Sequence, residues 1–245
     1  MTERGMIFNG EMVRAILDGR KTQTRRIMKV QPESNQLGLL LITDSTKHSD
    51  IGKYHWAESN ATGNHVRSKL FLCPFGAVGD RIWVREGFFP APLEMQSEPP
   101  RKTMWNIAYR DGMQMEKLAP AEYNPTIYNY ERWTPSIHMP RWASRILLEI
   151  TDVRVERLNA ISEEDAQREG VHTEVWDQTV VARNYAARDE FFQFWSEDMP
   201  HYVEMNQLYR SSFRSLWESI YGAENWQANP WVWVISFKRV EGGAA

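Results

Sequence analysis

The chain has 245 residues, of which 42% are hydrophobic and 25% are charged, and its formal net charge at pH 7 is −3. This length and composition, with 11 tryptophans, predict an ordered globular protein and exclude a disordered tail. No stretch approaches the roughly 20 apolar residues that a membrane-spanning helix needs, and residues 1–10 lack the apolar core of a signal peptide. We therefore expect a cytoplasmic protein with no membrane partner.

The composition also argues against two common kinds of site. Cys73 is the single cysteine, so neither an internal disulfide nor a multi-cysteine zinc site can form. The six histidines show no spacing that would place two of them on one helical face, and we predict no metal. The acidic balance disfavours a duplex-DNA binder with a broad basic face. Residues 14–29 nevertheless hold six basic side chains against Asp18 alone, which leaves a local site for an anion or a nucleotide open.

The first predicted element is a short helix. Asn9 can cap it, and Gly19 can supply the left-handed residue that ends it. The apolar residues between them recur at helical spacing: Met12, Val13, Ile16 and Leu17. The chain then runs into an extended segment that carries Lys21, Thr24 and Arg26.

The next part of the chain is polar and then becomes strand-like. Ser34–Lys69 has weak periodicity and favours a long insertion, with a hairpin at residues 37–43. In residues 76–88 a turn leads into a strand in which Ile82 and Val84 alternate with arginine and tryptophan.

The middle of the chain predicts loops followed by a strand and a helix. Residues 90–140 are rich in proline and aromatic side chains, which favours a loop-dominated segment with a strand at residues 106–109. Residues 143–158 contain one strand or two. A compact helix follows, which Ser162 caps and Gly170 closes, with acidic residues near its positive N-terminal end.

The last third predicts an insertion, a helix and a strand. Residues 175–209 are aromatic and of mixed charge, with an ambiguously helical centre at residues 188–195. Residues 211–222 have the spacing of an amphipathic helix, and residues 230–240 close the chain as a strand. The order of elements predicts an α+β fold, a small β-barrel flanked by helices, with long loops that can wall a pocket. We expect a single domain over residues 1–245, with insertions at about 31–75, 90–140 and 172–209.

One short segment resembles a known family. Its motif residues fall on the pattern G-x-K-x-x-[E/T]-x-R and are Gly19, Lys21, Thr24 and Arg26. This pattern resembles the signature of the ASCH family, a group of PUA-like β-barrel domains associated with RNA and nucleotides. The threonine makes the chain most similar to the small bacterial N4-acetylcytidine amidohydrolases. The likeness covers about residues 5–30, 76–89, 143–171 and 210–240, and the greater length resembles the longer ASCH-like proteins of bacteriophages and prophages.

The resemblance implies an activity and a set of catalytic residues. The family's catalytic lysine and threonine fall on Lys21 and Thr24, and its catalytic glutamate falls on Glu169. The implied reaction is hydrolysis of an amide on a modified nucleobase or nucleoside, most simply N4-acetylcytidine to cytidine and acetate, without a metal or organic cofactor. Thr24 is then the nucleophile, Lys21 its activator and Glu169 the acid-base partner. Such a partner is needed because a threonine hydroxyl is too weak an acid to attack an amide unaided, and nearby arginines are expected to lower the pKa of Lys21.

Three more residues are assigned to substrate binding, each with a structural alternative. Arg26 can grip a carbonyl or a phosphate, or it can pair with Glu86. Glu86 can be a second carboxylate in the pocket, and the catalytic one in place of Glu169, or it can form a salt bridge at the barrel rim. Trp83 can stack on a nucleobase or belong to the core.

The motif itself also has a plain structural interpretation, in which Lys21 is a solvated turn residue and Thr24 an ordinary strand residue. The alternative function is a non-catalytic module that binds RNA or a nucleotide, with Trp83 reading a base. A phage accessory protein with a degenerate pocket is a third interpretation. Thr24 discriminates between the first two functions, because a pure binder has no need of a hydroxyl matched to a lysine.

Overall fold

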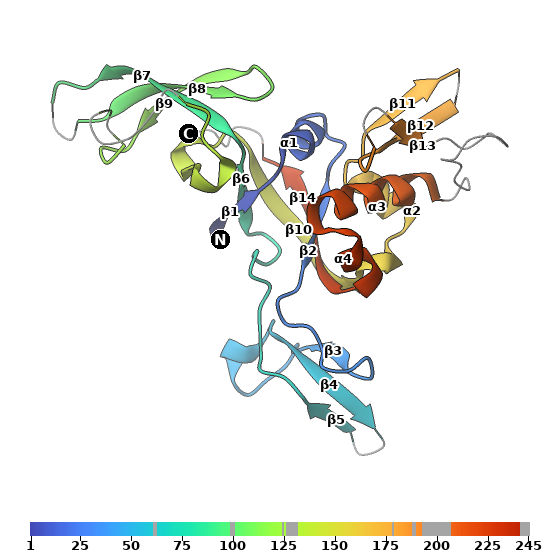
Figure 1. The fold of residues 1–245 in the computed structure, drawn as a ribbon. Coiled ribbons are helices and arrows are strands. Elements are labelled where there is room, and N and C mark those ends of the chain that lie inside the picture. The colour runs from blue at the N-terminus through green and yellow to red at the C-terminus, as the bar shows by residue number, and fades with distance from the viewer. Residues whose placement is uncertain are drawn as a thin grey trace.

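The computed structural model describes residues 1–60, 63–98, 101–123, 125, 132–177, 179–187, 190–192 and 207–240. A five-stranded sheet forms its centre, and three small three-stranded sheets and the helices surround it (Figure 1). The α+β prediction is confirmed. Within the described ranges no sheet closes into a barrel through its backbone ladders. None of the helices in these ranges is both long enough and apolar enough to span a membrane.

The central sheet collects strands from the whole length of the chain. Its members are β1 (Glu3–Ile7), β2 (Gln23–Ile27), β6 (Arg81–Arg85), β10 (Leu147–Arg157) and β14 (Trp231–Arg239). They lie in the order β1, β6, β10, β14, β2, and only the β1 and β6 pair is parallel. Residues 143–158 thus hold one strand, with a register shift between Ile150 and Asp152. Strand β1 was not predicted from the sequence. Met6 is its one buried residue, so the strand shows no alternation of apolar and polar residues.

Each face of this sheet packs against a different set of helices. Alternate residues of β14 reach opposite faces, so Trp233 and Ile235 join Val13 in one core while Val234 joins Phe213 in the other. The first core is covered by α1 (Gly10–Leu17). The second is covered by α2 (Glu163–Arg168), α3 (Leu208–Tyr221) and α4 (Ala223–Ala228). Burying each large apolar side chain contributes about 1.5–3 kcal/mol, which fixes the sheet between its helices.

The predicted helix boundaries are largely confirmed. Asn9 accepts a hydrogen bond from the backbone of Met12, and Ser162 does the same for Asp165. The glycine after each of α1 and α2 has positive φ, as a helix stop requires. The helix expected at residues 211–222 starts earlier, at Leu208, and α4 was not predicted.

The first insertion forms a sheet and not a lone hairpin. Its strands are β3 (Gly38–Leu41), β4 (Tyr54–Asn60) and β5 (Gly63–Val66). The hairpin expected at residues 37–43 is wrong, because β3 pairs with β4. The ring of Tyr54 lies 5.0 Å from that of Trp233, and the ring of Trp56 lies 5.3 Å from that of Trp231. This insertion is therefore packed into the main core.

The second insertion is also a sheet, so the expected loop-dominated segment is wrong. Its strands are β7 (Phe88–Met95), β8 (Thr103–Tyr109) and β9 (Gln114–Ala119). The strand expected at residues 106–109 is the end of β8. Pro90 and Pro92 suggested loops, but they lie on β7, an edge strand, where a missing N–H breaks no ladder.

The third insertion begins as a further sheet. Its strands are β11 (Thr173–Trp176), β12 (Thr179–Asn184) and β13 (Glu190–Phe192). The helical centre expected at residues 188–195 is wrong for residues 190–192, and its other residues lie outside the described ones. Short 3₁₀ turns lie in the connections: η1 (His48–Asp50), η2 (Ser136–His138), η3 (Arg141–Ala143) and η4 (Leu158–Ala160).

Gly170 should be irreplaceable by alanine. Its φ is +82°, and an added Cβ would lie 2.6 Å from Cβ of Lys21 and 2.9 Å from Cβ of Ala15. Gly170→Ala should lower the free energy of unfolding by about 2–4 kcal/mol, from strain plus overpacking. Gly112→Ala is the matched control, since its φ is +87° and nothing lies within 4 Å. Urea unfolding of both variants measures the difference, and equal losses would contradict the proposed clash.

Candidate active site

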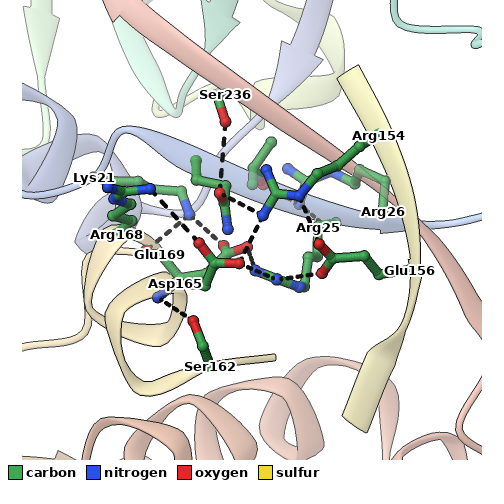
Figure 2. Close-up of polar contacts among 12 residues, drawn as sticks. Lys21, Arg25, Arg26, Arg154, Glu156, Ser162, Asp165, Arg168, Glu169 and Ser236 are labelled. Atoms are coloured by element: carbon green, nitrogen blue, oxygen red, sulfur yellow. Dashed lines mark hydrogen bonds and ion pairs between the residues drawn. The ribbon is translucent and has the colours of Figure 1, made fainter. Parts of the chain in front are cut away.

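Lys21 and Glu169, which lie 148 positions apart in the sequence, meet in a buried ion pair (Figure 2). Lys21 follows the turn at Gly19, and Glu169 is the C-cap residue directly after α2. The Lys21 ammonium donates to Oε2 and to the backbone carbonyl of Glu169, both at 2.8 Å. The two residues are 2% and 3% exposed. The interpretation of Lys21 as a solvated turn residue is therefore wrong.

Further charged groups continue this pair into a network. Arg25 Nη1 donates to Glu169 Oε1 at 3.1 Å, and Arg25 Nη2 reaches Glu156 at 2.9 Å and Asp165 at 3.0 Å. Arg154 contacts the same two carboxylates, each at 2.6 Å. We call this group the ionic cluster; its members are Lys21, Arg25, Arg154, Glu156, Asp165 and Glu169. Its three cations balance its three anions, and Lys21, Arg25 and Glu169 are its buried members.

Burial sets the electrostatics of Lys21. Removing the ammonium from water lowers the pKa of Lys21 below its ordinary value, and this effect outweighs the opposing charge and hydrogen bond of Glu169. Arg26 and Arg25 lower the pKa further, by smaller amounts. The direction is the one expected from the sequence, but its main cause is burial and not the neighbouring arginines.

Thr24 and Arg26 form a second contact, on the opposite side of β2. Arg25 and Thr24 are consecutive strand residues, so their side chains point to opposite faces. Thr24 is fully buried, and its Oγ1 accepts a hydrogen bond of 2.9 Å from Arg26 Nη1. Arg26 Nη2 also donates to the carbonyl of Ile7 in β1, and its guanidinium lies 5.3 Å from the ring centroid of Phe8. In the described part of the chain no hydrogen bond joins Lys21 to Thr24.

Glu86 lies in a different charge cluster. Its carboxylate receives two hydrogen bonds of 2.8 Å from Arg145, which also contacts Asp111 at 2.9 Å. Burial raises the pKa of Glu86, although the hydrogen bonds and charge of Arg145 oppose this. Its hydrogen-bond partners place it with Arg145, and it pairs neither with Lys21 nor with Arg26 among the described contacts.

Trp83 packs within the protein. A Cβ added at Gly5 would lie 2.6 Å from its ring, so the two residues are in close contact across β1 and β6. Its ring also packs against the core that contains Phe88 and Trp105, with the Arg85 guanidinium 5.4 Å from the ring centroid. Among the described contacts, none joins Trp83 to a member of the ionic cluster.

Sequence reasoning missed most of the ionic cluster. Arg154 and Glu156 are two residues apart on β10, a spacing that places both on one strand face, and this signal was available. Asp165 lies in the first turn of α2, and no role was predicted for it from the sequence. Gln23 also borders the cluster, since its Oε1 accepts from Arg154 at 3.2 Å.

No family model, curated protein or solved structure matches the chain. Among the residues that the structure describes, no group of three or more His, Cys, Asp or Glu side chains could hold a metal ion.

The ionic cluster should give the protein an acid-sensitive stability. Burial acts to raise the pKa of Asp165, but hydrogen bonds and charges from Arg25 and Arg154 outweigh it, and the pKa is lowered. The ionised Asp165 therefore stabilises the folded protein above about pH 4, where the carboxyl of the unfolded chain is also ionised. This stabilisation is lost as the pH falls through the lowered pKa of Asp165 in the folded protein.

Asp165→Asn should lower the free energy of unfolding by about 2 kcal/mol at neutral pH, and this deficit should shrink towards about pH 3. Urea titrations at both pH values test this. Glu164→Gln is the control, because the side chain is 71% exposed and its pair with Arg168 should contribute less than about 0.5 kcal/mol. A deficit that is equal at both pH values would argue against the charge-based explanation.

Proposed function

We propose that this protein is an amidohydrolase of the ASCH type that removes an acyl group from a modified cytosine nucleoside, most simply N4-acetylcytidine. The products are cytidine and acetate. The observation that carries the proposal is the 2.8 Å contact between Lys21 and Glu169, the two distant residues that the family resemblance pairs. A buried lysine whose pKa is lowered and which donates to a carboxylate is a combination suited to proton transfer.

The curvature of the central sheet supports the PUA-like part of the proposal. Its edge strands β1 and β2 share no backbone ladder, yet Arg26 of β2 donates to the carbonyl of Ile7 in β1 at 3.0 Å. Two edges of a sheet approach in this way only when the sheet curls back on itself. We propose a PUA-like barrel that is left open between β1 and β2 and bridged there by Arg26.

In the proposed reaction the ion pair first redistributes its proton. Lys21 passes one proton to Glu169 along their existing hydrogen bond, which leaves a neutral amine and a neutral carboxyl. The amine then takes the hydroxyl proton of Thr24 while Oγ1 attacks the acyl carbonyl carbon. The bond from that carbon to the exocyclic nitrogen breaks, and Glu169 protonates the nitrogen. Water hydrolyses the resulting threonine ester, releases acetate and restores the hydroxyl.

Arg26 has a further role in this scheme. Its guanidinium donates to Thr24 Oγ1 and remains charged, so it stabilises negative charge that develops on this oxygen. This contact pairs Arg26 with Thr24, and not with Glu86. Among the described contacts Lys21 donates to Glu169 and not to Thr24, so the scheme requires that Lys21 turns towards Thr24 when substrate is bound, as catalytic hydrogen bonds often form only then.

Removing the nucleophile should abolish turnover and leave the fold intact. Thr24→Ala should reduce hydrolysis of N4-acetylcytidine about 1000-fold or more, with a stability cost of about 1 kcal/mol, while Thr24→Ser retains part of the rate. Chromatography for cytidine is the assay. Thr103→Ala, a buried strand threonine in β8, should be as active as the parent. Full activity of Thr24→Ala would remove threonine from the mechanism.

The two members of the ion pair should fail for different chemical reasons. Lys21→Arg cannot accept a proton and Glu169→Gln cannot deliver one, so each should lose a factor of about 100 or more in single-turnover rate. Glu164→Gln, on the same helix, is the control. Glu163 is unsuitable as a control, since its carboxylate accepts from the backbone of Tyr209 and Arg210 at the start of α3.

Two outcomes would redirect the proposal. Retained turnover in Lys21→Arg would show that Lys21 supplies charge alone. If the folded parent binds N4-acetylcytidine and releases no cytidine, the non-catalytic nucleotide-binding module becomes the better interpretation.

A further inference from the structure

A cleft of about 380 Å³ lies between α1 and the sheet of β11, β12 and β13. Three arginines from different segments line it: Arg14 of α1, Arg20 after it and Arg183 of β12. Figure 1 shows α1 and this sheet beside one another above the central sheet. The cleft is therefore built jointly by the motif region and the third insertion, and its volume is in the range of small-molecule sites.

One face of the insertion sheet continues this cleft with aromatic groups. Glu174 is opposite Val181, and Trp176 is opposite Thr179. Residues 179, 181 and 183 alternate along β12, and Arg183 is opposite Phe191. Alternate residues share a face, and directly paired residues do too. Arg183, Trp176 and Phe191 therefore project from the same face of this sheet.

The aromatic groups are already held in place. The rings of Trp176 and Phe191 lie 4.9 Å apart, and Trp176 Nε1 donates to Glu174 Oε2 at 2.8 Å. His172 contacts the other oxygen of Glu174 at 3.1 Å and lies 6.1 Å from the Phe191 ring. Trp176 remains 40% exposed. The face thus presents a partly exposed aromatic surface whose orientation is set before any ligand binds.

The charges of the cleft leave one arginine available. Arg20 contacts Asp18 at 2.9 Å, and Arg183 contacts Glu11 at 2.7 Å. Arg14 is exposed and has no side-chain partner in the described part of the chain. The cleft therefore carries three guanidinium groups against two carboxylates, with one guanidinium free to take an anion.

We propose that this cleft and the adjoining aromatic face bind a nucleotide unit, with its phosphate on Arg14 and its base on Trp176 and Phe191. Guanidinium groups recognise phosphate, and exposed aromatic rings stack on bases of any sequence. The ligand is a phosphorylated nucleoside, free or within a single strand. Gly170, which lines the cleft, touches Lys21, so the site adjoins the ionic cluster. The cleft adds a binding surface next to the proposed hydrolytic site, and ligand binding there does not depend on the hydrolysis.

The test is a binding measurement with unmodified ligands. Fluorescence anisotropy of a labelled single-stranded oligocytidylate gives the affinity and its dependence on salt, and cytidine 5′-monophosphate and cytidine serve as competitors. Trp176→Ala should weaken strand binding roughly 5- to 100-fold. Arg14→Ala should also weaken binding and make the log–log salt slope shallower by about 0.7, as expected for one lost phosphate contact.

Matched controls separate this site from general effects. Trp133→Ala removes another 40% exposed tryptophan, and Arg214→Ala removes an exposed arginine of α3; both should bind as the parent does. Competition by the monophosphate but not by cytidine identifies a free nucleotide as sufficient, whereas binding of the strand alone identifies a phosphodiester ligand. Either result supports the site.

Absence of strand and monophosphate binding overturns the proposal, as does binding that neither Arg14→Ala nor Trp176→Ala weakens. Thr24→Ala distinguishes the two proposals, because it should bind the strand normally. Binding without hydrolysis removes the proposed function and leaves this site, whereas hydrolysis without binding here does the reverse.

Discussion

The arrangement of the candidate site depends on the buried carboxylate of Glu169. One of its oxygens accepts from Lys21 and the other from Arg25. Taking such charges out of water costs several kcal/mol per ion, so they are tolerated only when each finds a partner of opposite sign. This requirement binds the end of α2 to β2 and to the turn after α1. Arg25 also reaches Asp165 on α2, which fixes the helix at a second point.

The same pairing supports two roles that place opposite demands on it. As a structural contact, it is strongest when Lys21 keeps its proton and Glu169 stays ionised. As proposed chemistry, it must let that proton move, and burial favours the neutral form by lowering the pKa of Lys21. The surrounding cations Arg25 and Arg26 shift the balance in the same direction. The hydrogen bonds hold the pair firmly in position, and the proposed chemistry requires that its proton can move.

The insertions extend the central fold in different ways. The first is packed into the main core through Trp56, and the second is joined to the central sheet by the cluster of Arg145, Glu86 and Asp111. The third stands beside α1 and contributes Arg183 to the cleft there. The third insertion thereby adds surface next to Gly170 and Lys21, beside the ionic cluster.

Local patterns in the sequence were enough to predict those elements whose signals lie within a few residues of one another. The caps at Asn9 and Ser162, the stops at Gly19 and Gly170 and the strand around Ile82 all follow from nearest-neighbour chemistry, and the structure confirms them. The resemblance of the motif selected Lys21 and Glu169, which the fold then brings together. The small sheets were not predicted because the sequence pattern of prolines and weak hydrophobic alternation is typical of loops, although prolines are also tolerated on an edge strand.

Only the tertiary structure decided how the motif residues are partnered. Strand alternation places Thr24 and Arg25 on opposite faces, but it does not state which face meets α2. That choice depends on apolar packing of β14 against two separate cores. Glu169 and Arg154 come to β2 from more than a hundred positions away. Contacts of that separation leave no local periodicity in the sequence, because they are set by the burial of other residues and by the need to neutralise each buried charge.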